Sequence, residues 1–291
     1  MIKKILKAIG LIIGAVLLLA AGFYLKASIS TNSRMNKVYA VDPQEIDISD
    51  DSATLALGKR LVVAKGCEEC HGEDLGGKVF IEDPAMGRLI ATNLTKGKGG
   101  LPQDYSRKDW VLALKHGLSR DMKPLLFMPA HEFTHFTEED LGAIIAYCEQ
   151  LRNVDREHPD HEIGPMAKIL TELGEFHLFP AEMIDHEKPL AKHVEVEVSA
   201  DYGKYLTVLC QGCHRENMKG GKPIAPGFPP VVDISSTGNP GKWTEEQFIN
   251  TLRTGKTPEG KQLKPEEMPW TMTAAYTDVE LKAIFAYLMS I

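Results

Sequence analysis

The sequence predicts an all-α protein, with one N-terminal membrane helix followed by two tandem helical domains. Three observations predict this class. An uncharged segment follows the first lysines, capped amphipathic helices recur along the rest of the chain, and these helices occur twice in the same order. The chain has 291 residues, enough for two domains of ordinary size, and its hydrophobic content of 43% is typical of globular proteins.

Residues 1–27 are predicted to form a signal-anchor transmembrane helix. Residues 8–25 carry no charge, and at ~1.5 Å per residue they span roughly 27 Å, close to the ~30 Å hydrocarbon core of a bilayer. Lys3, Lys4 and Lys7 precede this run, so we expect the N-terminus in the cytoplasm and the remainder outside it.

A cleaved signal peptide is the alternative interpretation of this N-terminal segment. Such a peptide has a shorter apolar core and a small-residue cleavage site, for which residues 19–23 are only a weak candidate. We therefore expect an uncleaved anchor, followed by a spacer over residues 28–48.

Two pentapeptides carry most of the chemistry: Cys67-Glu68-Glu69-Cys70-His71 and Cys210-Gln211-Gly212-Cys213-His214. Each is a C-x-x-C-H motif. Two thiols one helical turn apart can add to the two vinyl groups of a porphyrin, and the next histidine then lies under the iron. We therefore predict two covalently attached haem c groups, with His71 and His214 as proximal iron ligands.

Other uses of these cysteines fit less well. A thioredoxin-like redox pair does not need the histidine, and zinc sites keep their two cysteine pairs much closer in sequence. Structural disulfides with a two-residue spacer are also a poor framework. The two motifs use four of the five cysteines, and for the fifth, Cys148, we expect a buried, inert thiol.

Each motif belongs to a repeated series of segments. An amphipathic helix precedes it, a glycine-rich loop and a middle helix follow, and a Met-Pro pair and a last helix close the series. The expected helices are 52–64, 106–117 and 137–147 in the first copy, and 200–209, 244–255 and 277–288 in the second. The middle helices begin at Ser or Thr and stop at Gly, and the last helices open with a capping box.

This order resembles the class I cytochrome c family, a small all-α domain in which the first and last helices cross and haem fills the core. The resemblance covers nearly all of residues 49–291 except a linker. It implies one domain over 49–151 and a second over 199–291.

The same resemblance implies that Met128 and Met268 are the second axial ligands, since each precedes a proline in its copy of the repeat. A soft thioether favours Fe(II) and raises the haem potential. The weaker alternatives are Met86, Met122, His131 and His135 in the first domain and Met272 in the second.

A proximal histidine also needs an acceptor for its other ring nitrogen. The resemblance suggests the carbonyl of a proline about a dozen residues later, which is Pro84 after His71 and Pro226 after His214.

Residues 152–198 are expected to form a proline-rich linker that wraps across both domains. We predict one short helix over 166–176 and expect residues 176–182 to pack between the domains. The five linker histidines could also form a metal site, but the wrapping interpretation is favoured. His131-Glu132-Phe133-Thr134-His135 matches the zinc-protease motif H-E-x-x-H formally. Because it lies between Met-Pro and a helix cap, we expect a loop or a single turn.

The haem portion resembles the cytochrome c subunits of membrane-bound alcohol and gluconate dehydrogenases, which have three such domains where this chain has two. The resemblance implies an electron carrier rather than an enzyme, held in the bacterial inner (cytoplasmic) membrane by a single pass, with its haem domains on the periplasmic side. It would pass electrons from a dehydrogenase or quinol-oxidising partner to a soluble cytochrome or a terminal oxidase.

The alternative function is a dihaem enzyme of the peroxidase or thiosulfate dehydrogenase type. A peroxidase needs a haem whose sixth position can open, which two matched Met-Pro pairs disfavour. A free carrier and a subunit of a larger complex both fit the sequence. The net charge of −7 and the absence of a basic patch with interleaved aromatic residues speak against nucleic-acid binding.

Overall fold

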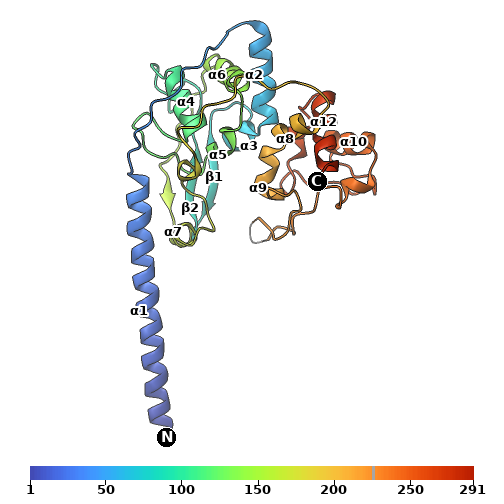
Figure 1. Ribbon diagram of the computed structural model, residues 1–291. Coiled ribbons are helices and arrows are strands. Elements are labelled where there is room, and N and C mark those ends of the chain that lie inside the picture. The colour runs from blue at the N-terminus through green and yellow to red at the C-terminus, as the bar shows by residue number, and fades with distance from the viewer. Residues whose placement is uncertain (225–226) are drawn as a thin grey trace.

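The computed structural model of the protein describes residues 1–224 and 227–291. A long helix, α1 (Ile2–Met35), extends away from two mainly helical domains that lie side by side (Figure 1). The all-α expectation, with two domains and an N-terminal apolar helix, is confirmed.

Domain 1 contains five further helices and a hairpin: α2 (Ser52–Ala64), α3 (Cys67–His71), β1 (Lys78–Asp83), β2 (Gly87–Ala91), α4 (Arg107–His116), α5 (Ala130–Phe133) and α6 (Glu138–Glu149). The linker adds β3 (Glu162–Ile163), α7 (Pro165–Glu172) and the 3-10 helix η1 (Pro180–Met183). Domain 2 consists of α8 (Ala200–Leu206), η2 (Val208–Cys210), α9 (Gln211–His214), η3 (Pro240–Lys242), α10 (Glu245–Thr254), α11 (Trp270–Thr273) and α12 (Asp278–Met289).

The predicted helix ends follow from local capping. Ser106 and Thr244 accept hydrogen bonds from the third residue of α4 and α10, and both helices stop at a left-handed glycine, Gly117 and Gly255. The first helix of domain 2 is shorter than predicted. α8 ends at Leu206 because Thr207 bonds back to the Lys204 carbonyl, and η2 continues the chain.

One predicted cap differs from the expectation. Thr277 forms a full capping box with Glu280, but the box at Thr137 is only half present. The Thr137 N–H donates instead to the Tyr205 hydroxyl of domain 2, and that hydroxyl donates to the Asp140 carboxylate. A side chain from the second domain therefore completes the cap of α6.

The first and last helices of each domain cross at a glycine, as the family resemblance implies. A Cβ placed on Gly58 of α2 would lie 1.9 Å from the Ala143 carbonyl oxygen, and one on Gly203 of α8 would lie 2.0 Å from that of Ala283. Only glycine allows such a close approach of two backbones. Gly58 and Gly203 are thus equivalent positions of the repeat.

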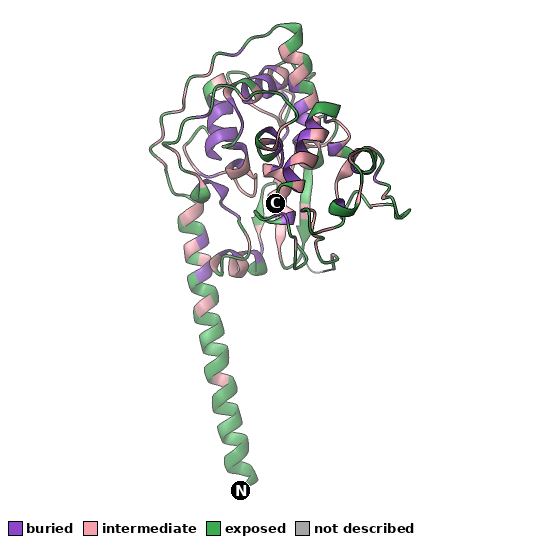
Figure 2. Cartoon of the chain, turned by 45° about the vertical axis from the view of Figure 1, so that its right-hand side comes forward, coloured by how far each residue is buried: buried purple, intermediate pink, exposed green. Residues whose placement is uncertain are grey.

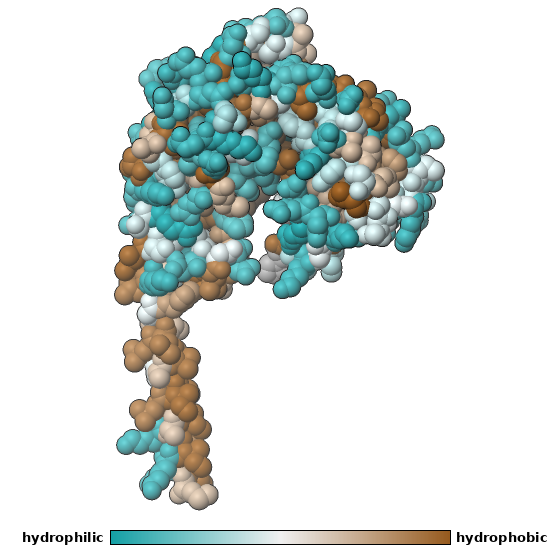
Figure 3. Space-filling view, viewed as in Figure 1, coloured by the Kyte–Doolittle hydropathy of each residue, from teal (hydrophilic) through white to brown (hydrophobic). Residues whose placement is uncertain are grey.

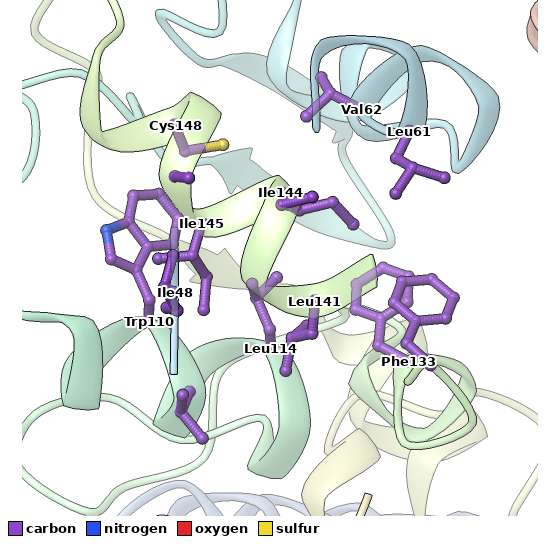
Figure 4. Close-up of a cluster of buried hydrophobic side chains, with 14 of the residues drawn as sticks. Ile48, Leu61, Val62, Trp110, Leu114, Phe133, Leu141, Ile144, Ile145 and Cys148 are labelled. Atoms are coloured by element: carbon purple, nitrogen blue, oxygen red, sulfur yellow. The ribbon is translucent and has the colours of Figure 1, made fainter. Parts of the chain in front are cut away.

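Each domain has its own apolar core. In domain 1 the side chains of Leu61, Trp110, Leu141 and Ile145 meet between α2, α4 and α6 (Figure 4). Cys148 lies in the same core, 5% exposed, and burial raises the pKa of its thiol well above the usual value. The expectation of a buried thiol is therefore confirmed. In domain 2 the core is formed by Tyr202, Leu206, Met218, Phe248, Leu281, Ile284 and Leu288.

A small antiparallel sheet of order β1-β2-β3 was not expected from the sequence. β1 and β2 form a hairpin in domain 1, and β3 joins it from the linker. The linker then continues along domain 1, and near its end Val194 packs on the core of domain 2.

The expectation that residues 176–182 pack between the domains is wrong. Leu178 and Phe179 are 0% and 2% exposed, and they pack with Leu89 of β2 and with Met35 at the end of α1. The hairpin and the end of α1 offer apolar side chains that this segment covers, so its burial occurs within domain 1.

Four of the five linker histidines contact different parts of domain 1. His158 bonds to the Gly76 carbonyl at 3.0 Å, His161 accepts from the Ile90 N–H at 3.2 Å, His186 lies 3.0 Å from His116, and His193 bonds to Glu139 at 2.8 Å. Within residues 1–224 and 227–291 no three metal-ligating side chains come together. The linker histidines thus do not gather into one metal site in the part of the chain that the structure describes.

α1 has two different parts. An 18-residue window of mean hydropathy 2.5 is not buried anywhere in the protein, as its green colour in Figure 2 shows. Near its C-terminal end, Ala27 and Thr31 are buried where α1 packs against α7. By length and composition this helix can cross a membrane, although a signal sequence meets the same criteria.

Candidate functional site

Each C-x-x-C-H motif folds as a short helical turn. In domain 1, Gly66 takes the left-handed conformation (φ 72°) that turns the chain from α2 into α3. The cysteines of this motif, Cys67 and Cys70, are therefore three residues apart on one turn. In domain 2, Cys210 and Cys213 have the same spacing where η2 leads into α9. All four thiols are free and only partly buried. This arrangement suits addition to the two vinyl groups of one porphyrin.

The histidine of each motif is fixed by a backbone carbonyl. His71 Nδ1 donates to the Thr92 oxygen at 2.7 Å, and His214 Nδ1 donates to the Val232 oxygen at 2.9 Å. Since a carbonyl can only accept, the proton must be on Nδ1, which leaves Nε2 as the free lone pair for a metal. Burial lowers the pKa of both histidines and keeps them neutral.

These bonds correct the proposed proline acceptors. Pro84 lies in the turn between β1 and β2, and the acceptor for His71 is Thr92 beyond that hairpin. Pro226 lies outside the described residues, and the carbonyl that His214 uses is that of Val232. In both domains the chain passes through a loop before it returns to the histidine.

The backbone around the two motifs is almost the same. The His71 carbonyl accepts from Gly77 N–H at 2.8 Å, and the His214 carbonyl accepts from Gly220 N–H at 2.9 Å. Leu75 and Met218 have φ of 53° and 58°, rare for residues other than glycine, and both are fully buried. The repeat therefore extends to single hydrogen bonds.

The two Met-Pro loops are also built alike. Their methionines, Met128 and Met268, are half-buried, and each carbonyl accepts from the N–H two residues later at 2.7 Å, at the start of α5 and of α11. Met128 packs against the domain 1 core. The structure thus places the two methionines at equivalent positions, and their role as axial ligands stays a prediction.

The alternative ligands occupy different surroundings. Met122 has a left-handed backbone (φ 58°) in the turn after α4, and Met86 adjoins the β1–β2 turn. Met272, on α11, lies against Gly66 of the other domain. The H-E-x-x-H segment forms one helical turn, α5, as expected, with His131 half-buried and His135 exposed.

The short helices after the two methionines reach across to the other domain. Glu132 of α5 contacts Gly212 of the second motif, where its Oε1 lies 2.9 Å from the position that a Cβ would take. Met272 of α11 contacts Gly66, which precedes the first motif. The attachment turn of each domain therefore lies next to the short helix that follows the Met-Pro pair of the other domain. Burial raises the pKa of Glu132 to about 7.

Two further contacts between the domains join equivalent positions of the repeat. Arg60 of α2 pairs with Glu280 of α12 at 2.7 Å, and Tyr205 of α8, its counterpart in the repeat, bonds to Asp140 of α6. Lys65 lies between them, 4% exposed, with its ammonium 5.0–5.6 Å from the ring centres of Phe136, Tyr205 and Tyr276.

Sequence reasoning did not identify these interface residues. Aligning the repeat on Gly58 and Gly203 would have shown that Arg60 and Tyr205 share a position. Their different chemistry, however, gives no signal that both face the other domain.

The residues present fit two haem c groups. Paired free thiols, a neutral histidine with Nε2 available and a half-buried methionine occur together in each domain. This is the donor set that c-type attachment with His/Met ligation requires.

Comparison with known proteins supports the same assignment. The cytochrome c family model matches residues 55–152 and 200–291. The fructose dehydrogenase cytochrome subunit of Gluconobacter japonicus is 26% identical over 259 residues, covering 82% of this chain and 52% of the relative. The cytochrome c subunit of the quinone alcohol dehydrogenase of Gluconacetobacter polyoxogenes is 23% identical over 269 residues, 83% of this chain and 56% of the relative.

The gluconate 2-dehydrogenase cytochrome c subunit of Pantoea cypripedii is 32% identical over 108 residues, 34% of this chain and 24% of the relative. The resemblance to dehydrogenase subunits expected from the sequence is thus confirmed. The chain spans about half the length of the first two relatives.

Proposed function

Since the chain belongs to the cytochrome c family, we propose that it is a membrane-tethered dihaem cytochrome c. It relays single electrons from a dehydrogenase or quinol-oxidising partner to a downstream cytochrome or a terminal oxidase. The relatives are cytochrome subunits of fructose, alcohol and gluconate dehydrogenases, which makes a sugar or alcohol dehydrogenase the class of partner that we favour.

The haem groups would supply the one-electron chemistry, and the protein residues hold them. Cys67 with Cys70, and Cys210 with Cys213, would form the thioether attachments. His71 and His214 would bind iron through Nε2, which the Nδ1 hydrogen bonds leave free. Met128 and Met268 would be the second protein ligands and would exclude water from the iron.

The observation that carries a relay is the contact between the two candidate sites. Glu132 and Met272 each join the methionine side of one domain to the attachment turn of the other. An electron passed between the two groups would therefore cross a packed interface rather than bulk water. Fixed separation of the two sites suits electron transfer, which needs no bond to form or break in the protein.

An electron carrier is favoured over a dihaem enzyme. A peroxidase needs one site that differs from the other, with a position that opens to substrate. From the methionine onward the two loops have matching backbone hydrogen bonds, so these bonds do not mark either as the open site.

The N-terminal helix is proposed to remain as an anchor in the bacterial inner membrane. Its apolar window is unburied within the protein, while the residues that follow pack on domain 1 as part of the same continuous helix. A signal peptide that is removed would not need to pack on the folded domain in this way. The haem domains would then face the periplasm.

The test is the mass and spectrum of the full-length protein purified from membranes. We expect two covalently bound haem c groups per chain, both low-spin when oxidised. Cys70→Ala and Cys213→Ala should each weaken attachment at one site only, and Cys148→Ala should leave both haems in place. A protein with bound zinc, one haem, or rapid peroxide turnover would contradict the proposal.

A further inference from the structure

α7 lies across the lower end of domain 1, beside the point where α1 meets it (Figures 1 and 2). One face of α7 packs on α1, where Ala167 and Thr171 are buried. Glu172, at its last turn, pairs with Lys26 of α1 at 2.8 Å. The helix is therefore fixed to the anchor along one side.

The opposite face of α7 is apolar and uncovered. Met166, Ile169 and Leu173 follow one another at helical spacing, and the first and last are 43% and 58% exposed. Among the described residues no segment covers them. Apolar side chains gather where α1 meets domain 1, and they continue the apolar surface of α1 itself (Figure 3).

The position of this face relative to the bilayer follows from the sequence of α1. The uncharged run ends at Leu25, and Lys26 is the first charge after it. A lysine at that position lies at the headgroup level of a bilayer that the run spans. Because Lys26 pairs with Glu172, the next residue, Leu173, is held at the same level.

The end of α1 also holds domain 1 in one orientation. α1 continues without interruption to Met35, and Arg34 donates to Glu182 at 2.9 Å while its guanidinium lies 4.9 Å from the Phe179 ring centre. Together with the Lys26–Glu172 pair, this fixes the last turns of α1 at two heights, so domain 1 cannot swing freely about the anchor.

We infer that α7 lies in the headgroup region of the membrane, with Met166, Ile169 and Leu173 in contact with phospholipid. Domain 1 then rests on the bilayer through α7. The inference depends on the uncleaved anchor proposed above. Phospholipid is the occupant that the structure favours, because the exposed face is continuous with the membrane-spanning surface of α1 and held at its end.

The test uses the full-length holoprotein in vesicles of phosphatidylcholine and phosphatidylglycerol. Leu173→Cys is labelled with an environment-sensitive fluorophore, and the emission is compared with and without lipid that carries a nitroxide near the headgroup. Leu173 is exposed, so the substitution leaves the fold intact, and Cys148 is too buried to label. The control is Lys261→Cys, an exposed position of domain 2.

We expect nitroxide lipid to remove most of the emission at position 173 and none at 261. If the protein sediments with vesicles but the label at 173 is unaffected, the anchor stands and the lipid contact is wrong, leaving this face to a partner protein. If the protein does not sediment with vesicles, both the anchor and the contact are wrong.

Discussion

At Met128 and Met268 the proposal depends on two thioethers. Met128→Ala and Met268→Ala should each lower the potential of one haem by on the order of 0.1 V, since the axial ligand is a main determinant of potential. The affected haem should also become high-spin when oxidised. Potentiometric titration monitored by visible absorption measures both effects.

The alternative methionines provide matched controls. Met122→Leu in domain 1 and Met272→Leu in domain 2 change similar side chains outside the two Met-Pro loops, so both potentials should stay within error of the wild type. Unchanged potentials in Met128→Ala, or a fall in either control, would show that the axial ligands are wrongly assigned.

Glu132 should make stability depend on pH. Its pKa is raised to about 7 by burial against the second motif, compared with 4.5 for an ordinary glutamate. A carboxyl group with a raised pKa stabilises the folded state below pH 4.5, and this contribution is lost as pH rises through about 7.

Glu132→Gln tests this dependence. Between pH 4.5 and about 7, the window set by the two pKa values, the wild type should lose stability relative to Glu132→Gln, as measured by denaturant unfolding of both proteins. Glu246→Gln, on the exposed first turn of α10, is the control and should follow the wild type. Parallel curves for wild type and Glu132→Gln would mean that Glu132 is already ionised in the fold.

The sequence predicts the roles of some residues but not of others. The cysteines and histidines of the motifs are identified by a local pattern that the chemistry requires. The partners of His71 and His214 are not, because Thr92 and Val232 return to the histidines only after loops of different length. Lys65 gives no signal either, since its aromatic neighbours come from both domains.

At the scale of elements, the crossing of α2 and α6 depends on Gly58. Gly58→Ala should lower the free energy of unfolding by about 3 kcal/mol or more, because the new Cβ collides with the Ala143 backbone. Gly203→Ala should do the same in domain 2. Thermal unfolding followed by circular dichroism measures the change.

Gly142→Ala is the matched control for the crossing. It lies in the same helix pair, but its Cβ would be 3.4 Å from an Ile48 side-chain carbon, an ordinary contact. Alanine is also the better helix former, by about 1 kcal/mol. If Gly58→Ala were as stable as Gly142→Ala, the close crossing would be wrong.

The cap of α6 by Tyr205 predicts a coupling between the domains. Tyr205→Phe leaves the Thr137 N–H and the Asp140 carboxylate without this partner and should cost about 1–3 kcal/mol. The amides at the start of α6, in the other domain, should then exchange hydrogen faster. Mass spectrometry of exchanged peptides detects this change.

Tyr202→Phe serves as its control, since the Tyr202 hydroxyl reaches Glu280 only at 3.4 Å and Arg60 still pairs with that carboxylate. It should leave α6 exchange unchanged. Equal exchange in Tyr205→Phe and the wild type would contradict the shared cap.

Helices were predictable to within a few residues because their caps are local. Ser106, Thr244 and Thr277 each mark a helix start that the structure has. The sheet and the path of residues 176–182 were not, since they depend on pairing between the hairpin and a linker far along the chain. The sequence pattern shows only that this segment is too apolar to be free.

At the scale of the whole molecule, the two domains face each other through equivalent but chemically different residues. An ion pair between Arg60 and Glu280 on one side corresponds to the hydrogen bond between Tyr205 and Asp140 on the other. A repeat in sequence predicts two similar domains, but not how they face each other. In the proposed relay, the electron would cross this interface.

A reductive titration of the full-length protein, followed by visible absorption and by peroxide turnover, tests the central claim most directly. The proposed relay predicts two one-electron steps per chain, two low-spin haems throughout, and no rapid consumption of peroxide. A single one-electron step, or a high-spin haem that turns over peroxide, would contradict it.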